Sequence, residues 1–326
     1  MGSELEKFDL SIVVPVMNEQ DTVPLFVEKV SQICLELKVS YEIIFVNDGS
    51  TDLTLNTLLD AQARYPSITV VNLSRNFGKE IALTAGLDHV NAQAVIPMDV
   101  DLQDPPHVIP DLYNKFIEGF DVVIAVRSKR DGDSRSKKIF ARAFYWLFEK
   151  ISDTPIIKQA GDFRIMSDRV VSVIRDMPER SRFMKGLFSW PGFKTTHIEY
   201  ERANRTNGDT KFKFVNLWKL ALDGVFSFST LPLKIWTYIG GTLAILSIVY
   251  MIFTVLKTMI LGIDMPGYAS LVTFVLLIGG MNLIGIGILG EYIGRIFIEV
   301  KGRPLYIVES VRRSSEQIEK EESSKL

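Results

Sequence analysis

Two long stretches without a charged residue constrain this chain more than any other feature of its sequence. Residues 235–256 and 268–290 contain 22 and 23 residues, none of them Asp, Glu, Lys or Arg. Each stretch exceeds the roughly 20 residues that an α-helix needs to cross the ~30 Å hydrocarbon core of a bilayer. A buried core helix would explain one such stretch, but two in succession favour a hairpin of two transmembrane helices.

Charged residues beside these stretches predict the orientation of the hairpin. The connecting loop contains only Lys257 and Asp264, whereas basic residues gather on the outer sides of the two stretches: Lys211, Lys213, Lys219, Lys234, Arg295, Lys301, Arg303, Arg312 and Arg313. Lys and Arg are enriched in cytoplasmic flanks. We therefore expect a multi-pass protein of the inner or plasma membrane with both termini in the cytosol.

The same pattern divides the chain into four parts. Residues 1–210 have the composition of a soluble domain, and residues 211–234 interleave aromatic residues with lysines, as interfacial amphipathic helices do. A helix that packs under the first domain is the alternative for residues 211–234. Residues 235–298 hold the two predicted spans, and residues 299–326 form a predicted cytosolic tail.

The first domain alternates short apolar runs with amphipathic helical stretches. We expect strands at residues 10–15, 41–47, 68–73, 94–98 and 121–126, with helices between them. This alternation predicts an α/β domain with a mostly parallel, Rossmann-like sheet. Ligands of such sheets bind beyond the carboxyl ends of the strands. Four of these strand ends carry polar residues, which predicts a single site: Asn18-Glu19, Asn47 to Ser50, Ser74 to Asn76 and Asp99 to Asp104.

Composition excludes several classes of function. The formal net charge of −2 gives no support for nucleic-acid binding. Cys34 is the only cysteine, so the chain has no internal disulfide and no cysteine metal cluster. Residues 1–210 contain neither G-x-G-x-x-G nor G-x-x-x-x-G-K-[ST], so this domain has neither a dinucleotide fingerprint nor a P-loop.

Two motifs at strand ends indicate chemistry. Asp99 and Asp101 can share a divalent cation such as Mg²⁺, which is commonly bound by one or two carboxylates together with substrate phosphates. A metal there would make a diphosphate a better leaving group. Asp48 lies in the segment Asn47 to Asp52, which reads as an Asx-turn and helix cap. The Asp48 carboxylate can also accept a ribose hydroxyl or a base N–H.

Three segments resemble one enzyme family: Val14 to Glu19, Val46 to Asp52 and Met98 to Pro106. In that order they resemble the inverting GT-A glycosyltransferases of family 2. Three further segments narrow the resemblance: Asn72 to Lys79, Gly161 to Arg164, and Gly290 to Arg295 after the second uncharged stretch. With them the chain resembles the polyprenyl-phosphate glycosyltransferases, which include bactoprenol glucosyltransferases and dolichol-phosphate mannose synthases.

This resemblance implies roles for individual residues. It places a nucleotide-sugar donor on Pro15, Val16, Glu19, Asp48, Lys79 and Asp99. It places the metal, Mg²⁺ or Mn²⁺, among Asp99, Asp101 and Gln103. It assigns the lipid phosphate to Arg127, Arg205 and Lys211, and it counts Asp162, Asp101 and Arg127 as the catalytic residues.

Asp162 occupies the position of a catalytic base in this fold, but the acceptor chemistry leaves its role open. A phosphate monoester has a second pKa of roughly 6 and is already largely ionised at neutral pH. Asp162 can therefore act as a base, orient an arginine such as Arg164, or hold a sugar hydroxyl.

The resemblance implies transfer of one sugar, first glucose from UDP-glucose, to a polyprenyl phosphate at the cytosolic membrane face. GDP-mannose and a UDP-aminoarabinose are alternative donors, and a non-catalytic nucleotide-sugar sensor is the alternative from another class. The chain lacks the Gln-x-x-Arg-Trp motif of processive synthases. Gly290 and Gly294 form a small-x-x-x-small pair, which is compatible with a homo-oligomer.

Overall fold

The computed structural model describes residues 7–127, 160–177, 179–180, 182, 184–200, 231–261 and 267–313. The chain forms two compact units. The first contains residues 1–149, 154–214 and 303–326, and the second contains residues 150–153 and 215–302.

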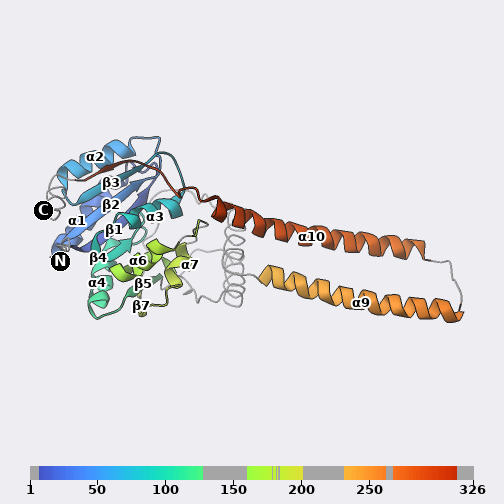
Figure 1. Cartoon of the computed structure of the whole chain (residues 1–326). Helices are drawn as coiled ribbons and strands as arrows, with labels where there is room; N and C mark the ends of the chain where they lie inside the picture. The colour runs from blue at the N-terminus through green and yellow to red at the C-terminus, as the bar shows by residue number, and fades with distance from the viewer. Residues whose placement is uncertain are drawn as a thin grey trace, which may run out of the picture. The chain divides into compact units, whose positions relative to one another are not determined.

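The first unit is an α/β domain whose strands form one sheet in the order β7-β5-β6-β4-β1-β2-β3-β8 (Figure 1). The strands are β1 (Phe8–Val16), β2 (Tyr41–Asn47), β3 (Ile68–Leu73), β4 (Ala92–Pro97), β5 (Val122–Arg127), β6 (Ala160–Ser167), β7 (Thr195–Tyr200) and β8 (Val308–Arg312). Of the seven strand pairings, the four that join β1 to β2, β1 to β4, β2 to β3 and β5 to β7 are parallel. The predicted mostly parallel sheet is confirmed.

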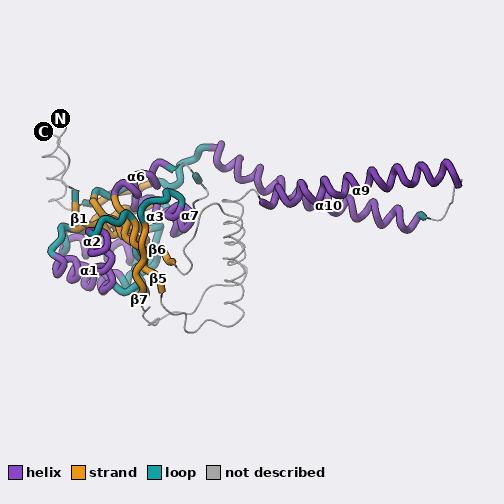
Figure 2. The backbone as a smooth tube through the Cα atoms, turned by 90° about the horizontal axis from the view of Figure 1, so that it is seen from below, coloured by secondary structure: helices purple, strands orange, loops and turns teal. Residues whose placement is uncertain are grey.

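Helices cover both faces of this sheet (Figure 2). One face carries α1 (Val23–Leu37), α2 (Thr54–Arg64), the 3₁₀ turn η1 (Pro106–Val108) and α4 (Ile109–Ile117). The other carries α3 (Lys79–Asp88), α6 (Asp168–Asp176) and α7 (Met184–Ser189). Because both faces are covered, strand residues of either parity are buried, as in Ile12, Val13 and Val14.

Close packing of α3 on the sheet depends on a glycine. A Cβ added to Gly86 would overlap the side chain of Val13 and press on that of Val46. On the opposite face, Phe26 of α1 meets Phe45 of β2 edge-to-face, with 5.9 Å between the ring centroids. These contacts fix the parallel strands from which the site loops project.

Strand β8, which was not predicted from the sequence, forms one edge of the sheet. It pairs antiparallel with β3, although it follows the second uncharged stretch in the chain. Asn47 Nδ2 donates to Asn72 Oδ1 (2.7 Å), and Asn72 Nδ2 donates to Glu309 Oε2 (2.7 Å). Tyr306 also donates its hydroxyl to Asp88 (2.7 Å). Part of the predicted tail therefore belongs to the α/β unit.

The second unit contains two long helices, α9 (Leu231–Leu261) and α10 (Tyr268–Lys301). Gly285 of α10 lies against the indole of Trp236 of α9, where an added Cβ would overlap the ring. None of the helices in the described residues combines the length and apolar character needed to cross a membrane. The spans predicted at residues 235–256 and 268–290 are therefore not confirmed.

Candidate active site

The polar loops of the α/β unit meet at a switch in strand order. The chain passes from β1 to β2 and β3 on one side and then returns to place β4 on the other side of β1. Loops that leave neighbouring strands in opposite directions open a crevice at their carboxyl ends. The segment Asn18-Glu19 follows β1, and the segment from Asp99 to Asp104 follows β4, so both polar clusters stand at the carboxyl ends of neighbouring strands.

Asp48 fixes the start of α3. Its side chain is 3% exposed, and its two oxygens accept the backbone N–H groups of Phe77 (2.7 Å) and Gly78 (2.9 Å). Gly49, with φ +65°, brings the loop after β2 so near the loop after β3 that an added Cβ would overlap the backbone of Arg75 and Asn76. Asp48 thus holds the loop that presents Lys79, the first residue of α3.

Lys79 bridges two carboxylates at the centre of the site. Its Nζ lies 2.7 Å from an oxygen of Asp99 and 3.0 Å from Oδ2 of Asp162. These three side chains come from α3, from the loop after β4 and from β6. The structure therefore joins Asp162, predicted as catalytic, to Lys79 and Asp99, which were predicted to bind the donor.

The charges in this cluster influence one another. Burial opposes the charge of Lys79, but Asp99 and Asp162 outweigh it and raise the pKa of Lys79 above its ordinary value. Burial, together with the nearby Asp162 and Asp101 carboxylates, raises the pKa of Asp99 although Lys79 works in the opposite direction. Lys79 pairs with Asp99 and Asp162, and the Asp101 carboxylate acts on Asp99, so the cluster has an excess of negative charge that a cation would neutralise.

Asp99 and Asp101 are the carboxylates that fit a divalent cation. The Asp99 side chain is 40% exposed and Asp101 is exposed, and Asp101 Oδ1 accepts the backbone N–H of Gln103 (3.1 Å). The Gln103 side chain lies mostly buried next to them. No group of three or more His, Cys, Asp or Glu residues suited to a metal occurs in the described part of the chain. Two carboxylates suffice where diphosphate oxygens and water complete the shell of a Mg²⁺-like ion.

The residues predicted for the nucleobase lie at the end of β1. Pro15 and Val16 belong to the strand itself, and Val16 is buried. Glu19 follows in the loop, where its Oε2 accepts the hydroxyl of Thr22 (2.8 Å) and its backbone N–H donates to Oγ1 of Thr54 (2.8 Å). These contacts hold Glu19 in the loop after β1 and against the start of α2, and its predicted base contact stays a prediction.

Arg127, at the end of β5, takes part in a network that the sequence did not reveal. Its Nε donates to the hydroxyl of Tyr200 (3.3 Å), and that hydroxyl donates to Oδ1 of Asp104 (2.5 Å). Arg127 Nη2 lies 3.6 Å from the same Asp104 oxygen. Asp104 belongs to the recognised segment after β4 but had received no role. Tyr200 carried no sequence signal, because its partner lies 96 residues away.

Arg164 lies beneath Asp162 on β6. Its side chain is completely buried among the largest core groups, and its guanidinium stacks 4.6 Å from the Phe188 ring centroid. Burial lowers the pKa of Arg164 to about 10, and the charge of Asp162 partly opposes this change. Nη2 of Arg164 donates to Gly161 O (2.8 Å), which ties Arg164 to the residue of β6 immediately before Asp162.

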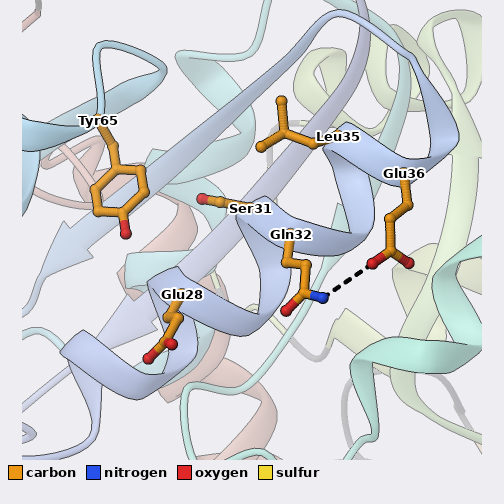
Figure 3. Close-up of a pocket in the computed structure, with 6 residues that line it drawn as sticks. All are labelled: Glu28, Ser31, Gln32, Leu35, Glu36 and Tyr65. Atoms are coloured by element: carbon orange, nitrogen blue, oxygen red, sulfur yellow. Dashed lines mark hydrogen bonds between the residues drawn. The ribbon is translucent and has the colours of Figure 1, made fainter.

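The predicted phosphate ligands Arg205 and Lys211 fall outside the described residues. A shallow hollow of about 450 Å³ lies between α1 and the end of α2 and is lined by Glu28, Ser31, Gln32, Leu35, Glu36 and Tyr65 (Figure 3). None of the predicted site residues lines this hollow, and the polar cluster at the strand ends is the candidate active site.

Two family models match the chain at these elements. Residues 11–172 match the model described as glycosyl transferase family 2, and residues 231–296 match the model described as the GtrB C-terminal hairpin. A bactoprenol glucosyl transferase homolog of an Escherichia coli K12 prophage is 49% identical over 304 residues, which cover 93% of this chain and 99% of the relative. The chain belongs to glycosyl transferase family 2. It is a glycosyltransferase with a GT-A fold.

Further relatives have similar coverage. An uncharacterized glycosyltransferase of Synechocystis is 49% identical over 300 residues, covering 92% of this chain and 94% of the relative. The bactoprenol glucosyl transferase of Shigella phage SfII is 48% identical over 307 residues, covering 94% and 99%. A crystal structure of mannosyl-3-phosphoglycerate synthase from Rubrobacter xylanophilus has a TM-score of 0.48 at 17% identity, covering 67% of this chain and 72% of that one.

Proposed function

We propose that this glycosyltransferase moves one glucosyl residue from UDP-glucose to a polyprenyl phosphate, with inversion at the anomeric carbon. The observation that carries the proposal is the cluster of Lys79, Asp99 and Asp162 beside Asp101 at the carboxyl ends of β4 and β6. Near-full-length relatives named bactoprenol glucosyl transferases support glucose and a bactoprenol acceptor.

Asp99, Asp101 and Gln103 are the residues that would hold a divalent cation, Mg²⁺ or Mn²⁺. Such an ion, when bound, supplies positive charge to the departing diphosphate. Lys79 adds a second positive charge on the side of Asp99 that faces Asp162. The same lysine fixes both carboxylates, so that they present the donor in one orientation.

The role of Asp162 follows from its contacts and from the acceptor. Its Oδ2 lies 3.0 Å from Lys79 Nζ, so this oxygen is engaged in an ion pair. Because a phosphate monoester is already ionised at neutral pH, deprotonation is not the difficult step. We propose that Asp162 orients Lys79 and a sugar hydroxyl, while Arg127 offsets the repulsion between the acceptor phosphate and the donor diphosphate.

We further propose that the helices α9 and α10 lie in the inner or plasma membrane and anchor the chain in the bilayer that contains the lipid acceptor. Large apolar side chains on both helices are exposed, among them Tyr250, Phe253 and Phe274. An exposed apolar surface of this kind is typical of a membrane or protein interface. Both termini would face the cytosol, with residues 211–234 at the membrane surface.

Topology can be tested with an introduced cysteine, because the native Cys34 is buried. Asp264→Cys lies in the connecting loop and should react in intact cells with a membrane-impermeant maleimide. A cysteine that replaces Ser323 in the tail should react only after the membrane is opened. Labelling of both positions, or of neither, in intact cells would reject this topology.

The activity is tested on the purified full chain with Mg²⁺ or Mn²⁺, undecaprenyl phosphate and radiolabelled donors. UDP-glucose should give a labelled lipid, and GDP-mannose and a UDP-aminoarabinose are the parallel donor arms. Asp101→Asn should remove metal-dependent transfer without altering the melting temperature. A chain that binds nucleotide sugars but labels no lipid from any donor would be a sensor, and the enzyme proposal would be lost.

A further inference from the structure

Two buried polar side chains, Tyr200 and Asp104, lie beside Arg127. Tyr200 is 6% exposed and Asp104 is 6% exposed, yet both place their polar atoms at the end of β5 beside Arg127. Their separation from Arg127 in sequence means that the fold, and not a local turn, assembles this group. A buried hydroxyl and a buried carboxylate cost free energy unless their hydrogen bonds are formed.

The geometry assigns different tasks to the two partners. The distance of 3.6 Å between Arg127 Nη2 and Asp104 Oδ1 is too long for a direct hydrogen bond. The Tyr200 hydroxyl spans this gap, since it accepts from Nε of Arg127 and donates to Asp104. The tyrosine thus fixes the plane of the guanidinium, and the Asp104 carboxylate supplies a negative charge close to it.

Arg127 keeps donors available in this arrangement. Its side chain is 25% exposed, and within the described part of the chain the Nη1 and Nη2 groups donate no hydrogen bond. A guanidinium has five N–H donors in a planar fork that matches two oxygens of a phosphate. Holding the guanidinium through Nε leaves the two Nη groups to meet such oxygens.

Burial, charge and ring packing keep the Tyr200 hydroxyl protonated and its ring in one orientation. Burial and the Asp104 charge raise the pKa of Tyr200 to about 12, so its hydroxyl stays a donor across the physiological range. The ring of Tyr200 meets Phe163 edge-to-face at 6.0 Å, which locks the ring orientation. Arg127 Nη2 lies 3.7 Å from the position that a Cβ on Gly161 would take, immediately before Asp162.

We infer that Tyr200 and Asp104 are positioning residues that aim Arg127 at the phosphate of the lipid acceptor. Asp104 directly follows Gln103, so the group also links the candidate metal loop to the acceptor arginine. The inference rests on the proposed function. It adds Tyr200 and Asp104 to the acceptor site, in which only Arg127 was predicted among the described residues.

The test compares two variants that each remove one tyrosine hydroxyl bonded to a carboxylate. Tyr200→Phe removes the bond to Asp104, and Tyr306→Phe removes the 2.7 Å bond to Asp88. The full chain in detergent is titrated with farnesyl phosphate, and KM is measured separately for undecaprenyl phosphate and for UDP-glucose. Asp104→Asn, which keeps an acceptor oxygen but removes the charge, separates geometry from charge.

Tyr200→Phe should weaken farnesyl phosphate binding and raise KM for the lipid by about tenfold, the loss expected for one hydrogen bond to a charged group. KM for UDP-glucose should stay within about twofold, a change equivalent to less than half a kcal/mol. Tyr306→Phe should leave both constants unchanged, and Asp104→Asn should fall between Tyr200→Phe and the wild type.

Each outcome bears on one of the two proposals. Equal farnesyl phosphate binding by the wild type and Tyr200→Phe overturns the inference, and so does a parallel rise in both KM values. Failure of the wild type to bind farnesyl phosphate also overturns it. A wild type that binds farnesyl phosphate with the expected Tyr200 dependence, but transfers no sugar, supports the inference and rejects the proposed function.

Discussion

Replacing Asp48 with asparagine tests whether one buried carboxylate holds the loop that begins α3. Its oxygens accept N–H groups from Phe77 (2.7 Å) and Gly78 (2.9 Å), and the side chain is 3% exposed. Asparagine keeps one acceptor oxygen but turns an NH₂ group toward the second N–H, so that one bond is lost and one donor stays unpaired. Hydrogen bonds to charged groups contribute about 1.5–3 kcal/mol, and an unpaired buried donor adds a penalty of similar size.

We expect Asp48→Asn to lower the free energy of unfolding of the α/β unit by about 3 kcal/mol. At roughly 2–4 °C per kcal/mol for a domain of this size, the melting temperature should fall by about 6–12 °C. Circular dichroism of the purified full chain in detergent measures this change. Asp60→Asn, on the exposed side of α2, is the control and should melt with the wild type. A shift of Asp48→Asn below about 2 °C would contradict the reasoning.

Three further predictions concern other parts of the chain. Burial raises the pKa of Glu42. The stability of the α/β unit therefore falls as pH rises from the pKa of Glu42 in the unfolded chain through its pKa in the folded chain. Glu42→Gln should melt at a higher temperature than the wild type at pH 7 and at the same temperature near about pH 3.5. Equal melting at pH 7 would argue against this. Burial raises the pKa of Cys34 to about 12, so the native thiol should resist iodoacetamide at pH 8 and react once unfolded; rapid native labelling would contradict the buried position. In Gly285→Val the new side chain should overlap Trp236 and lower the protease resistance of the α9–α10 hairpin. Gly287→Val is the control, because a Cβ there meets no described atom within 4 Å. Equal digestion of the two variants would refute the contact.

Sequence periodicity located the regular elements well. The strands predicted at residues 41–47 and 68–73 have those bounds in the structure, because polar turn residues end their apolar runs. Asp48, Asp99 and Asp101 could be placed at one edge of the sheet for the same reason, since parallel strands carry their carboxyl ends to one side. The chemistry at that edge was therefore predictable in its residue types.

The pairings within the site were not predictable from one sequence. The ion pairs of Lys79 and the bond between Tyr200 and Asp104 join residues that are 20 to 96 positions apart. Nothing in local pattern indicates which of several charged neighbours will meet after folding. Strand β8 was missed for a different reason. It is an edge strand with exposed and half-buried side chains, so it lacks the apolar alternation that identifies a strand.

The position of β8 also has a consequence for the order in which the protein is made. Residues 308–312 leave the ribosome after both helices of the hairpin, yet they form the strand that covers β3. Until then β3 presents an open edge, which is a site for pairing with other chains. The sheet of the α/β unit is thus completed only after synthesis of the hairpin. In a nascent chain stalled before Glu309, the edge of β3 would stay unpaired and aggregation-prone, and Asn72 would lack its Glu309 partner.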